Sequence, residues 1–276
     1  MPLLRHTLRS LRVQIVAYGV GIGLYAALMV LLYPVFKDTL AELEIPEGYA
    51  AFFGQEATDF SDPRTFLTAE LMSLLPLITA IYAVVASTGL LASDEQRGTL
   101  ELLLSQPLSR ARLFVERVGA LVIGALLISL LGAIGFAIPA LFVDLGGVSP
   151  LVLAGAMFNL VPLMLACAGL GLLVAAVAPS RGVASGIVAA ETAVVFLMNS
   201  VANLADVLEP LHYLSPFYYA DSNVVLTNGP SPWHIAVLLG AFVGLTALAQ
   251  RAFARREIGG TRWQPRALLG GDGSAE

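Results

Sequence analysis

The chain has 276 residues, of which 57% are hydrophobic and only 13% are charged, about half the charged fraction of an ordinary soluble domain. Its 15 basic and 20 acidic side chains are too few to cover the core of a soluble protein of this length, so the composition indicates a surface that faces lipid. The net charge of -5 argues against nucleic acid as a partner, and the single cysteine, Cys167, excludes an internal disulfide bond.

The first apolar stretch, residues 13–36, predicts a membrane span that stays in the protein. Its length of about 24 residues exceeds the roughly 7–15 apolar residues of a secretory signal peptide. The preceding residues 3–11 alternate arginine with leucine, which suits a basic segment lying on anionic lipid.

Five further stretches are long enough to cross a bilayer core about 30 Å thick, at residues 70–92, 113–141, 151–178, 183–205 and 233–253. Asp62 followed by Pro63 is a start signal for the helix of the second span. Pro76, Pro139 and Pro162 should kink their helices or end them early. We therefore predict an all-α integral membrane protein, a single transmembrane domain over 1–276 with about six spans and a cytosolic tail at 254–276.

The basic residues orient the predicted spans. With six spans, 13 of the 15 basic residues fall on one side, and only Lys37 and Arg64 fall on the other. Cytoplasmic loops of membrane proteins are enriched in lysine and arginine, so the pattern predicts that both termini lie in the cytoplasm and that the chain sits in the cytoplasmic (cell) membrane. The 13 residues are Arg5, Arg9, Arg12, Arg97, Arg110, Arg112, Arg117, Arg181, Arg251, Arg255, Arg256, Arg262 and Arg266.

The outer side has an acidic loop at 37–69 and aromatic residues near the ends of the spans. Tyr213, Tyr218, Tyr219 and Trp233 lie where an interfacial aromatic belt is expected. The 206–232 connection is too apolar for a free loop, so we expect short outer helices at the interface there.

The cytosolic connection between the second and third spans has the pattern of a short amphipathic helix at 94–106. Ser93 and Gln96 have the spacing of a capping box, which starts a helix. Pro107 ends it, and a helix over these residues would place Leu100, Leu103 and Leu104 on one face. Taken without further context, the same pattern is also typical of a charged loop with interfacial leucines.

The run from Asp94 to Arg110 closely resembles the signature of the type-2 ATP-binding-cassette (ABC) exporter permeases, E-x-x-x-G-T-L-x-x-L-L-x-x-P-x-x-R. Here the acidic residue is Asp94 on the usual spacing, or Glu95 one position nearer to the Gly-Thr pair. The long first outer loop, the segment 214–229 and the arginine-rich end of the last span also resemble this family, so the resemblance covers essentially the whole chain. Residues 3–11 resemble the family's amphipathic connecting helix.

The resemblance implies that 94–106 is a coupling helix that docks into a separate ABC ATPase subunit. Two ATPase copies and a second permease copy are implied, and ATP and Mg²⁺ would be bound by the ATPase, with no cofactor in this chain. The residues that match the family's interface are Asp94, Glu95, Arg97, Gly98, Thr99, Leu100, Glu101, Leu104, Pro107 and Arg110.

The sequence itself has no nucleotide-binding P-loop, G-x-x-x-x-G-K-[ST], because the sole lysine, Lys37, follows Tyr33-Pro34-Val35-Phe36. The chain is therefore predicted to be a non-catalytic membrane subunit. We also find no sequence pattern for a metal site or for an intramembrane enzyme.

Glu191 lies well inside a predicted span, where an ionised carboxylate costs about 2.5–3.5 kcal/mol. Two interpretations are open: Glu191 lines an export path or binds a cation, together with Thr192 and Asn199, or it is paired structurally with a neighbouring helix. The alternative to an ABC permease is an ion-coupled secondary transporter that uses Glu191.

Other intramembrane residues are predicted to serve packing. Asn159, Asn199, Asn203 and Thr192 suit interhelical hydrogen bonds, and the small-residue pairs suit close helix approach. Cys167 is predicted to be a core residue, and His212 and His234 are predicted to be structural. The small-residue pairs are Gly19/Gly23, Gly182/Gly186 and Gly240/Gly244.

Overall fold

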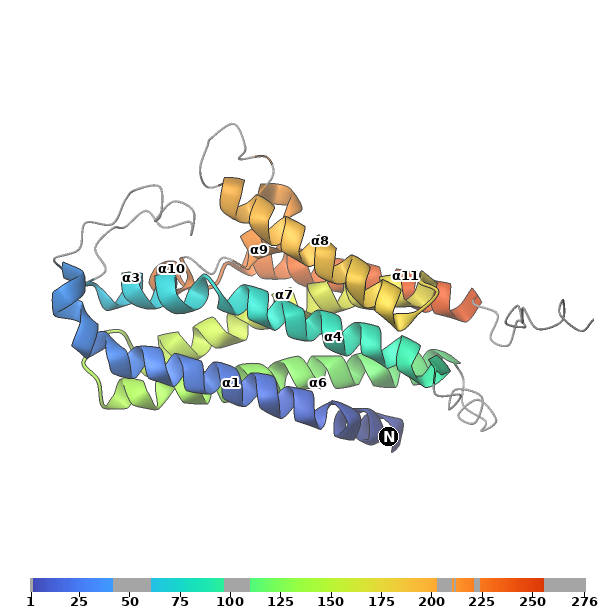
Figure 1. Ribbon diagram of the computed structural model, residues 1–276, viewed down its shortest axis with the longest axis horizontal. Helices are drawn as coiled ribbons and strands as arrows, with labels where there is room; N and C mark the ends of the chain where they lie inside the picture. The colour runs from blue at the N-terminus through green and yellow to red at the C-terminus, as the bar shows by residue number, and fades with distance from the viewer. Residues whose placement is uncertain are drawn as a thin grey trace, which may run out of the picture.

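The computed structural model describes residues 2–41, 61–96, 110–202, 210, 212–220 and 224–255. Every regular element among these residues is helical, which confirms the predicted all-α fold. Within the described ranges six helices are long and apolar enough to cross a membrane, as predicted, and they run lengthwise through the molecule (Figure 1). The long helices are α1 (Pro2–Ala41), α4 (Leu75–Gln96), α6 (Arg110–Ala137), α7 (Pro150–Val177), α8 (Arg181–Ala202) and α11 (Pro232–Arg255).

Short helical elements extend or connect the spans. The second span starts with α3 (Pro63–Leu67), passes through a π-helical turn η1 (Thr68–Met72) and continues as α4. A 3-10 turn η2 (Pro139–Leu141) follows α6, and α9 (Pro216–Tyr219) and α10 (Val225–Asn228) precede α11. The short helices expected within 206–232 are therefore present.

The proline predictions are confirmed at two of three positions. Asp62 is the N-cap of α3 with Pro63 as its first residue, and the second span breaks at 73–74, just before Pro76. Helix α6 ends two residues before Pro139, because proline cannot supply the amide that the helix needs. Pro162, by contrast, lies inside α7 without ending it.

Two helix boundaries differ from the predictions. Helix α1 is continuous from Pro2, so residues 3–11 and the span 13–36 belong to one helix. Helix α4 continues through Ser93 to Gln96, so Ser93 does not start a new helix and the predicted boundary there is wrong. A capping box starts a helix by satisfying amides that have no partner in a preceding turn. At Ser93 those amides are already bonded within α4, so no new helix starts there.

Helix α7 is the centre of the bundle, where it packs against α4, α6, α8 and α11. In its most apolar 18-residue window 78% of the residues are buried, against 17% for α8 and for α11. Small residues explain this position, since a Cβ on Gly171 would run into the Ser87 side chain of α4, and one on Gly169 would lie 3.3 Å from Phe242 O of α11. Small residues let several helices approach one helix closely.

Helix α1 packs mainly against α6. A Cβ on Gly135 of α6 would collide with the backbone of Gly23, and one on Gly19 would collide with the Leu131 side chain. The predicted close approach at Gly19/Gly23 is thus confirmed. Nothing lies within 4 Å of the built Cβ of Gly182, Gly186, Gly240 or Gly244, so those pairs make no close approach within the described chain.

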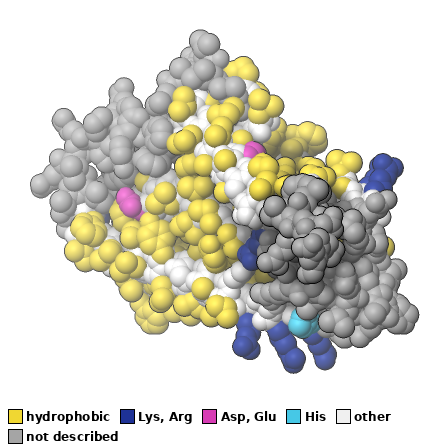
Figure 2. Space-filling view, turned by 45° about the vertical axis from the view of Figure 1, so that its right-hand side comes forward, with side chains coloured by type: hydrophobic (Ala, Val, Ile, Leu, Met, Phe, Trp, Pro, Cys, Tyr) yellow, Lys and Arg dark blue, Asp and Glu magenta, His cyan; other side chains and the backbone are white. Residues whose placement is uncertain are grey.

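The surface has the pattern of a lipid-facing bundle. Hydrophobic side chains cover most of the described face in Figure 2, and the lysine and arginine side chains gather towards one end. Large exposed apolar residues follow one side of α1 from Val13 to Val35, including Leu24 at 67% exposure. Such a surface is unfavourable in water and suits acyl chains.

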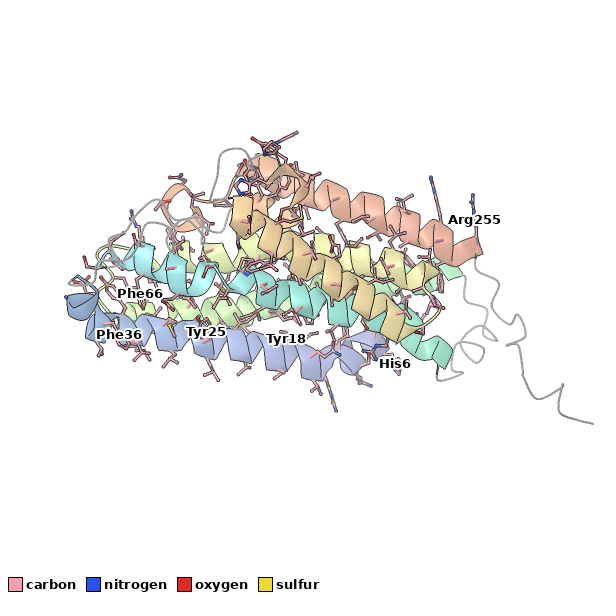
Figure 3. The ribbon with its side chains drawn as sticks, turned by 45° about the horizontal axis from the view of Figure 1, so that its top comes forward. His6, Tyr18, Tyr25, Phe36, Phe66 and Arg255 are labelled. Carbon is pink, nitrogen blue, oxygen red and sulfur yellow. The ribbon has the colours of Figure 1, made fainter. Side chains whose placement is uncertain are left out.

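One end of the bundle, here called the basic end, carries the start of α1, the α7–α8 turn and the end of α11. His6 and Arg255 lie at this end, opposite Phe36 and Phe66 (Figure 3). Arg112 and Arg117 in the first turns of α6 and Arg181 at the start of α8 also belong to it. The predicted topology places these arginines on one side of the membrane, and the structure places them at one end of the bundle.

Candidate functional site

A cavity of about 230 Å³ lies between α7, α8, α11 and the segment that contains α9. Glu191 and Thr192 of α8 line it, together with Cys167 of α7 and Tyr219 of α9. The remaining lining is apolar, and includes Phe217 and Leu238. We call this cavity the Glu191 pocket.

The outer wall of the Glu191 pocket is held by hydrogen bonds. The Ser215 hydroxyl accepts a bond of 3.2 Å from the Phe217 amide, which caps α9 and so fixes Phe217 against Phe196 of α8 at a ring distance of 5.3 Å. Asn159 Nδ2 of α7 donates to Ala220 O at 2.5 Å, directly after α9. This confirms an interhelical bonding role for Asn159 and gives the pocket a firm outer boundary.

Aromatic rings cluster beside α9. Tyr218 stacks on His212 at 5.5 Å and also contacts Tyr213, Tyr219 and His234. His212 is within 3.2 Å of Asn199 O. These contacts agree with the predicted structural role of both histidines. Two of the rings, Tyr218 and His234, contact Tyr219, which lines the Glu191 pocket.

Glu191 stands at the middle of α8, about ten residues or roughly 15 Å from the helix start. Among the described residues that line the pocket none is basic. Apart from Glu191, the polar side chains of the lining are Thr192, Cys167 and Tyr219. Such a site can accept a bulky apolar molecule and offers a cationic group an acidic partner.

The structure brings together only part of the predicted path. Glu191 and Thr192 share the pocket, whereas Asn199 does not line it and its backbone carbonyl lies next to His212 instead. Cys167 is buried at 7% exposure, as expected of a core residue, but it also lines the pocket. Sequence reasoning missed Tyr219 and Phe217 as pocket residues, since the short helix that carries them folds back onto α7 and α8.

Most of the predicted coupling motif lies outside the described residues. Asp94 and Glu95 belong to the last turn of α4, and Arg110 is the first residue of α6. Arg97, Gly98, Thr99, Leu100, Glu101, Leu104 and Pro107 lie within 97–109, which the structure does not describe. The motif therefore connects the ends of α4 and α6.

A buried acid that sequence reasoning missed joins the start of α6 to α1 through a hydrogen bond. Glu116 is 7% exposed, accepts the Leu4 amide of α1 at 3.0 Å, and forms an ion pair of 3.1 Å with Arg112 one turn earlier. The spacing of Arg112 and Glu116 is a detectable helical pair, but the contact with Leu4 is a tertiary feature. Beside it, Phe114 contacts Phe253 of α11 at a ring distance of 6.1 Å.

A second acid lies in the π-helical turn η1. Glu70 is half-buried there, and its backbone carbonyl accepts the Tyr25 hydroxyl of α1 at 2.7 Å. The π-helical turn makes the backbone of the second span irregular at residues 68–72. Irregular backbone within a span is tolerated where protein groups satisfy it.

The six long apolar helices of the described residues and their apolar surface are those of a multi-pass membrane protein, and the bundle encloses a pocket with mostly apolar walls and one acid. The family model described as "Multidrug efflux system permease Rv1217c, C-terminal domain" matches residues 5–254, and the chain belongs to this family. The chain is therefore a permease of the efflux type. Comparison with curated proteins gave no match.

Proposed function

We propose that the chain is the membrane subunit of an ATP-driven exporter of the ABC-2 type, in which a separate ATPase drives transport. Two permease copies and two ATPase subunits would form the transporter in the cytoplasmic membrane, with both termini of this chain in the cytoplasm. The match of residues 5–254 to an efflux permease family carries the proposal. The signature between Asp94 and Arg110 supports the ABC assignment.

The position of the motif suits the transmission of movement. A force on 97–109 would reach α6 at Arg110, less than two helical turns before Glu116. Helix α6 is fastened there to α1 through Leu4 and to α11 through Phe253. Because a packed bundle moves in discrete rigid parts, displacement of this segment would shift three helices together.

The Glu191 pocket is the proposed substrate site. The family name describes a multidrug efflux system, and a cavity of about 230 Å³ with apolar walls fits part of a drug-like amphiphile. Glu191 would favour substrates that carry a positive charge, because an opposite charge offsets the cost of a carboxylate in an apolar site.

Co-purification with the ATPase tests the coupling role. The experiment expresses the chain with a candidate ATPase subunit and measures the ATPase retained on the affinity-tagged permease. Leu104→Asp should abolish retention, because it places a charge on the apolar face of the predicted helix. Leu102→Asp is the matched control, because a helical repeat of 100° per residue places Leu102 on the opposite face.

Full ATPase retention by Leu104→Asp would refute the docking proposal. Equal loss from Leu102→Asp would also contradict it, because the effect would then not depend on the face. Export that persists without any ATPase would instead favour the ion-coupled alternative through Glu191, which gains no support from the family match.

A further inference from the structure

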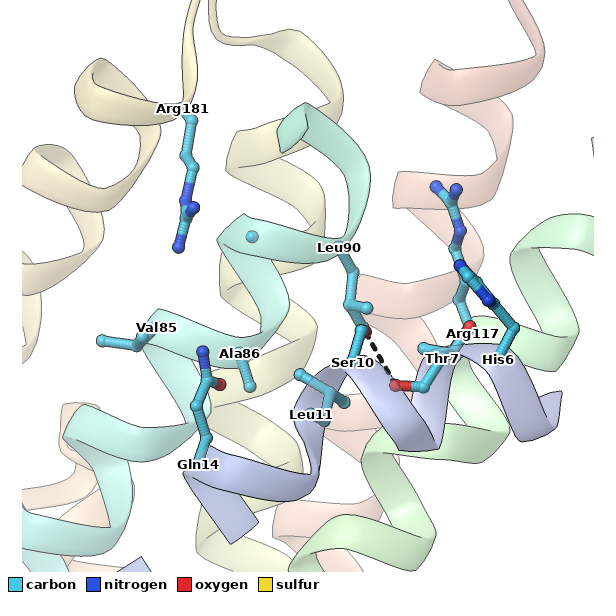
Figure 4. A pocket seen from close by; sticks show the side chains of 11 residues that line it. His6, Thr7, Ser10, Leu11, Gln14, Val85, Ala86, Leu90, Arg117 and Arg181 are labelled. Carbon is cyan, nitrogen blue, oxygen red and sulfur yellow. Dashed lines mark hydrogen bonds between the residues drawn. The ribbon is translucent and has the colours of Figure 1, made fainter. Parts of the chain in front are cut away.

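A second cavity, of about 150 Å³, lies at the basic end of the bundle, apart from the Glu191 pocket. Helices α1 and α4 supply most of its lining, and Arg117 of α6 and Arg181 of α8 line it on either side of α4 (Figure 4). The volume is below the roughly 300–1,000 Å³ of pockets for drug-sized ligands, so it suits the headgroup of a larger molecule. We call this cavity the polar pocket.

The α1 wall of the polar pocket carries a row of polar side chains. Thr7, Ser10 and Gln14 follow one another at intervals of three and four residues, which places them on one face of the helix. The Thr7 hydroxyl donates to Leu3 O at 2.9 Å, and the Ser10 hydroxyl donates to Thr7 O at 2.8 Å (Figure 4). Because each hydroxyl uses its only proton within the helix, it offers a ligand an acceptor.

Gln14 adds an amide whose oxygen lacks a partner. Its Oε1 atom is buried, and among the described residues nothing donates a hydrogen bond to it. Buried polar atoms are nearly always paired, so an unpaired amide oxygen in the wall of a cavity indicates a ligand with a proton to donate. The amide nitrogen can donate in return, so the side chain suits a partner that both donates and accepts.

The charges of the lining argue against a cation. Arg117 and Arg181 line the polar pocket, and none of its described lining residues is acidic, so a cation would find no opposite charge to offset its desolvation. An anion is disfavoured by the acceptors on α1. A neutral group with several hydroxyls satisfies both conditions, because each hydroxyl can donate to the oxygens of Thr7, Ser10 and Gln14 and can also accept.

A third cavity continues the seam between α1 and α4 towards the other end of the bundle. It begins three residues after Gln14 and extends about 12 Å along α1. Apart from two tyrosine hydroxyls its lining is apolar, and Ala17 and Gly21 are exposed, so it is a groove that opens on the lipid-facing surface. We call it the apolar groove; its volume is about 260 Å³ and its lining residues are Ala17, Tyr18, Gly21, Ile22, Tyr25 and Ile78.

We propose that the polar pocket and the apolar groove together bind one glycolipid, a lipid with a neutral, polyhydroxylated headgroup. The headgroup hydroxyls bond to α1 in the polar pocket, and an acyl chain lies in the apolar groove. The order of the two cavities supports this arrangement, because the polar pocket lies at the basic end, which the predicted topology places at the cytoplasmic surface. Binding there requires no ATPase, so the site can be tested on the chain alone.

The test uses the purified full chain in phosphatidylcholine nanodiscs. Three lipids with the same acyl chains are added in turn: monoglucosyl diacylglycerol, phosphatidic acid and diacylglycerol. Native mass spectrometry measures the lipid retained, and the thermal unfolding midpoint measures the stabilisation. The glucosyl lipid should be retained and should raise the midpoint, whereas the other two lipids should stay at their bulk fraction.

Ser10→Ala removes one acceptor and should weaken retention of the glucosyl lipid by about fivefold, the value of one neutral hydrogen bond. Ser185→Ala is the matched control, because the Ser185 hydroxyl makes the same kind of bond, to Gly182 O at 3.1 Å, but lines neither cavity. Gln14→Leu should also weaken retention, without lowering the unfolding midpoint of the lipid-free chain, because it removes a buried oxygen that has no partner.

Gly21→Leu tests the apolar groove. Nothing lies within 4 Å of a Cβ built on Gly21, so the new side chain would fill the groove without disturbing the bundle. Retention of the glucosyl lipid should fall by about fivefold or more, because its chain loses apolar contact area. Gly155→Leu is the control, since Gly155 is exposed on α7, has the same free space and lines neither cavity.

Free glucose separates the headgroup from the chain. Displacement of the glucosyl lipid by glucose shows that the headgroup is sufficient for binding, and retention in excess glucose shows that the chain contributes; either result supports the proposal. It is overturned if the glucosyl lipid is retained no better than diacylglycerol or phosphatidic acid, or if Ser185→Ala loses as much as Ser10→Ala. Unchanged retention in Gly21→Leu would overturn the assignment of the acyl chain to the groove.

Discussion

A methyl group at Gly135 would test the close crossing of α1 and α6. In Gly135→Ala, the new Cβ would collide with backbone atoms of Gly23 on α1. A backbone cannot rotate away as a side chain can, so α1 and α6 would have to separate along a contact that also includes Leu131 and Gly19. The same change at Gly21, where nothing lies within 4 Å, is the matched control.

The expected magnitude follows from two opposing effects. Overpacking costs about 1–3 kcal/mol, and replacing glycine by alanine within a helix returns about 0.5–1 kcal/mol. Because the collision is with backbone, the upper part of the overpacking range, about 2–3 kcal/mol, applies here. Gly135→Ala should therefore lower the free energy of unfolding by about 1–2.5 kcal/mol, and Gly21→Ala should raise it by about 0.5–1 kcal/mol. Thermal unfolding of both variants in detergent micelles, followed by tryptophan fluorescence, measures the difference.

The result that would refute this reasoning is a Gly135→Ala variant that melts at or above the wild-type temperature while Gly21→Ala is stabilised as expected. The α1–α6 contact would then be looser than the structure has it. Destabilisation of both variants to the same degree would also contradict it, because the cost would then not come from the crossing.

Three further predictions concern the candidate site. Glu191→Gln should reduce the ATP-driven accumulation of lipophilic cations in inverted vesicles by about tenfold and leave that of neutral compounds of similar size within about twofold; equal loss for both classes would exclude an electrostatic role. Glu116→Gln should lower the melting temperature more than Arg112→Ala, because Glu116 is buried and also binds the Leu4 amide; equal shifts would show that the Leu4 bond contributes little. Asn159→Leu should cost about 0.6 kcal/mol, a typical membrane hydrogen bond, and expose the segment after α9 to protease; an unchanged cleavage rate would argue against that bond.

The spans were predictable because hydropathy is a local property. A stretch of about 20 apolar residues has to be helical in a bilayer, whatever it packs against. The Asp62-Pro63 start and the end before Pro139 were predictable for the same reason, since both depend on neighbouring residues alone. The boundary at Ser93 was not, because a capping box cannot show whether the preceding helix has already ended.

The candidate site was predictable only in part. Glu191 stands out in the sequence as a charge within an apolar stretch. Its partners in the pocket come from α7, α9 and α11, up to 54 positions further along the chain at Leu245, and no local pattern connects them. The role of 94–106 as a coupling helix stays a prediction, because 97–109 lie outside the described residues.

The sequence by itself determined the membrane class, the number of spans and the sorting of the arginines, since each follows from the transfer energy of single side chains between water and lipid. Only the tertiary structure decided that α7 lies at the centre, that Glu116 joins α6 to α1, and that Arg117 and Arg181 line one cavity. Lipid solvates an apolar helix on any side, so hydropathy cannot choose which face packs against protein. That choice depends on the close fit of small residues such as Gly135 and Gly171 between neighbouring helices.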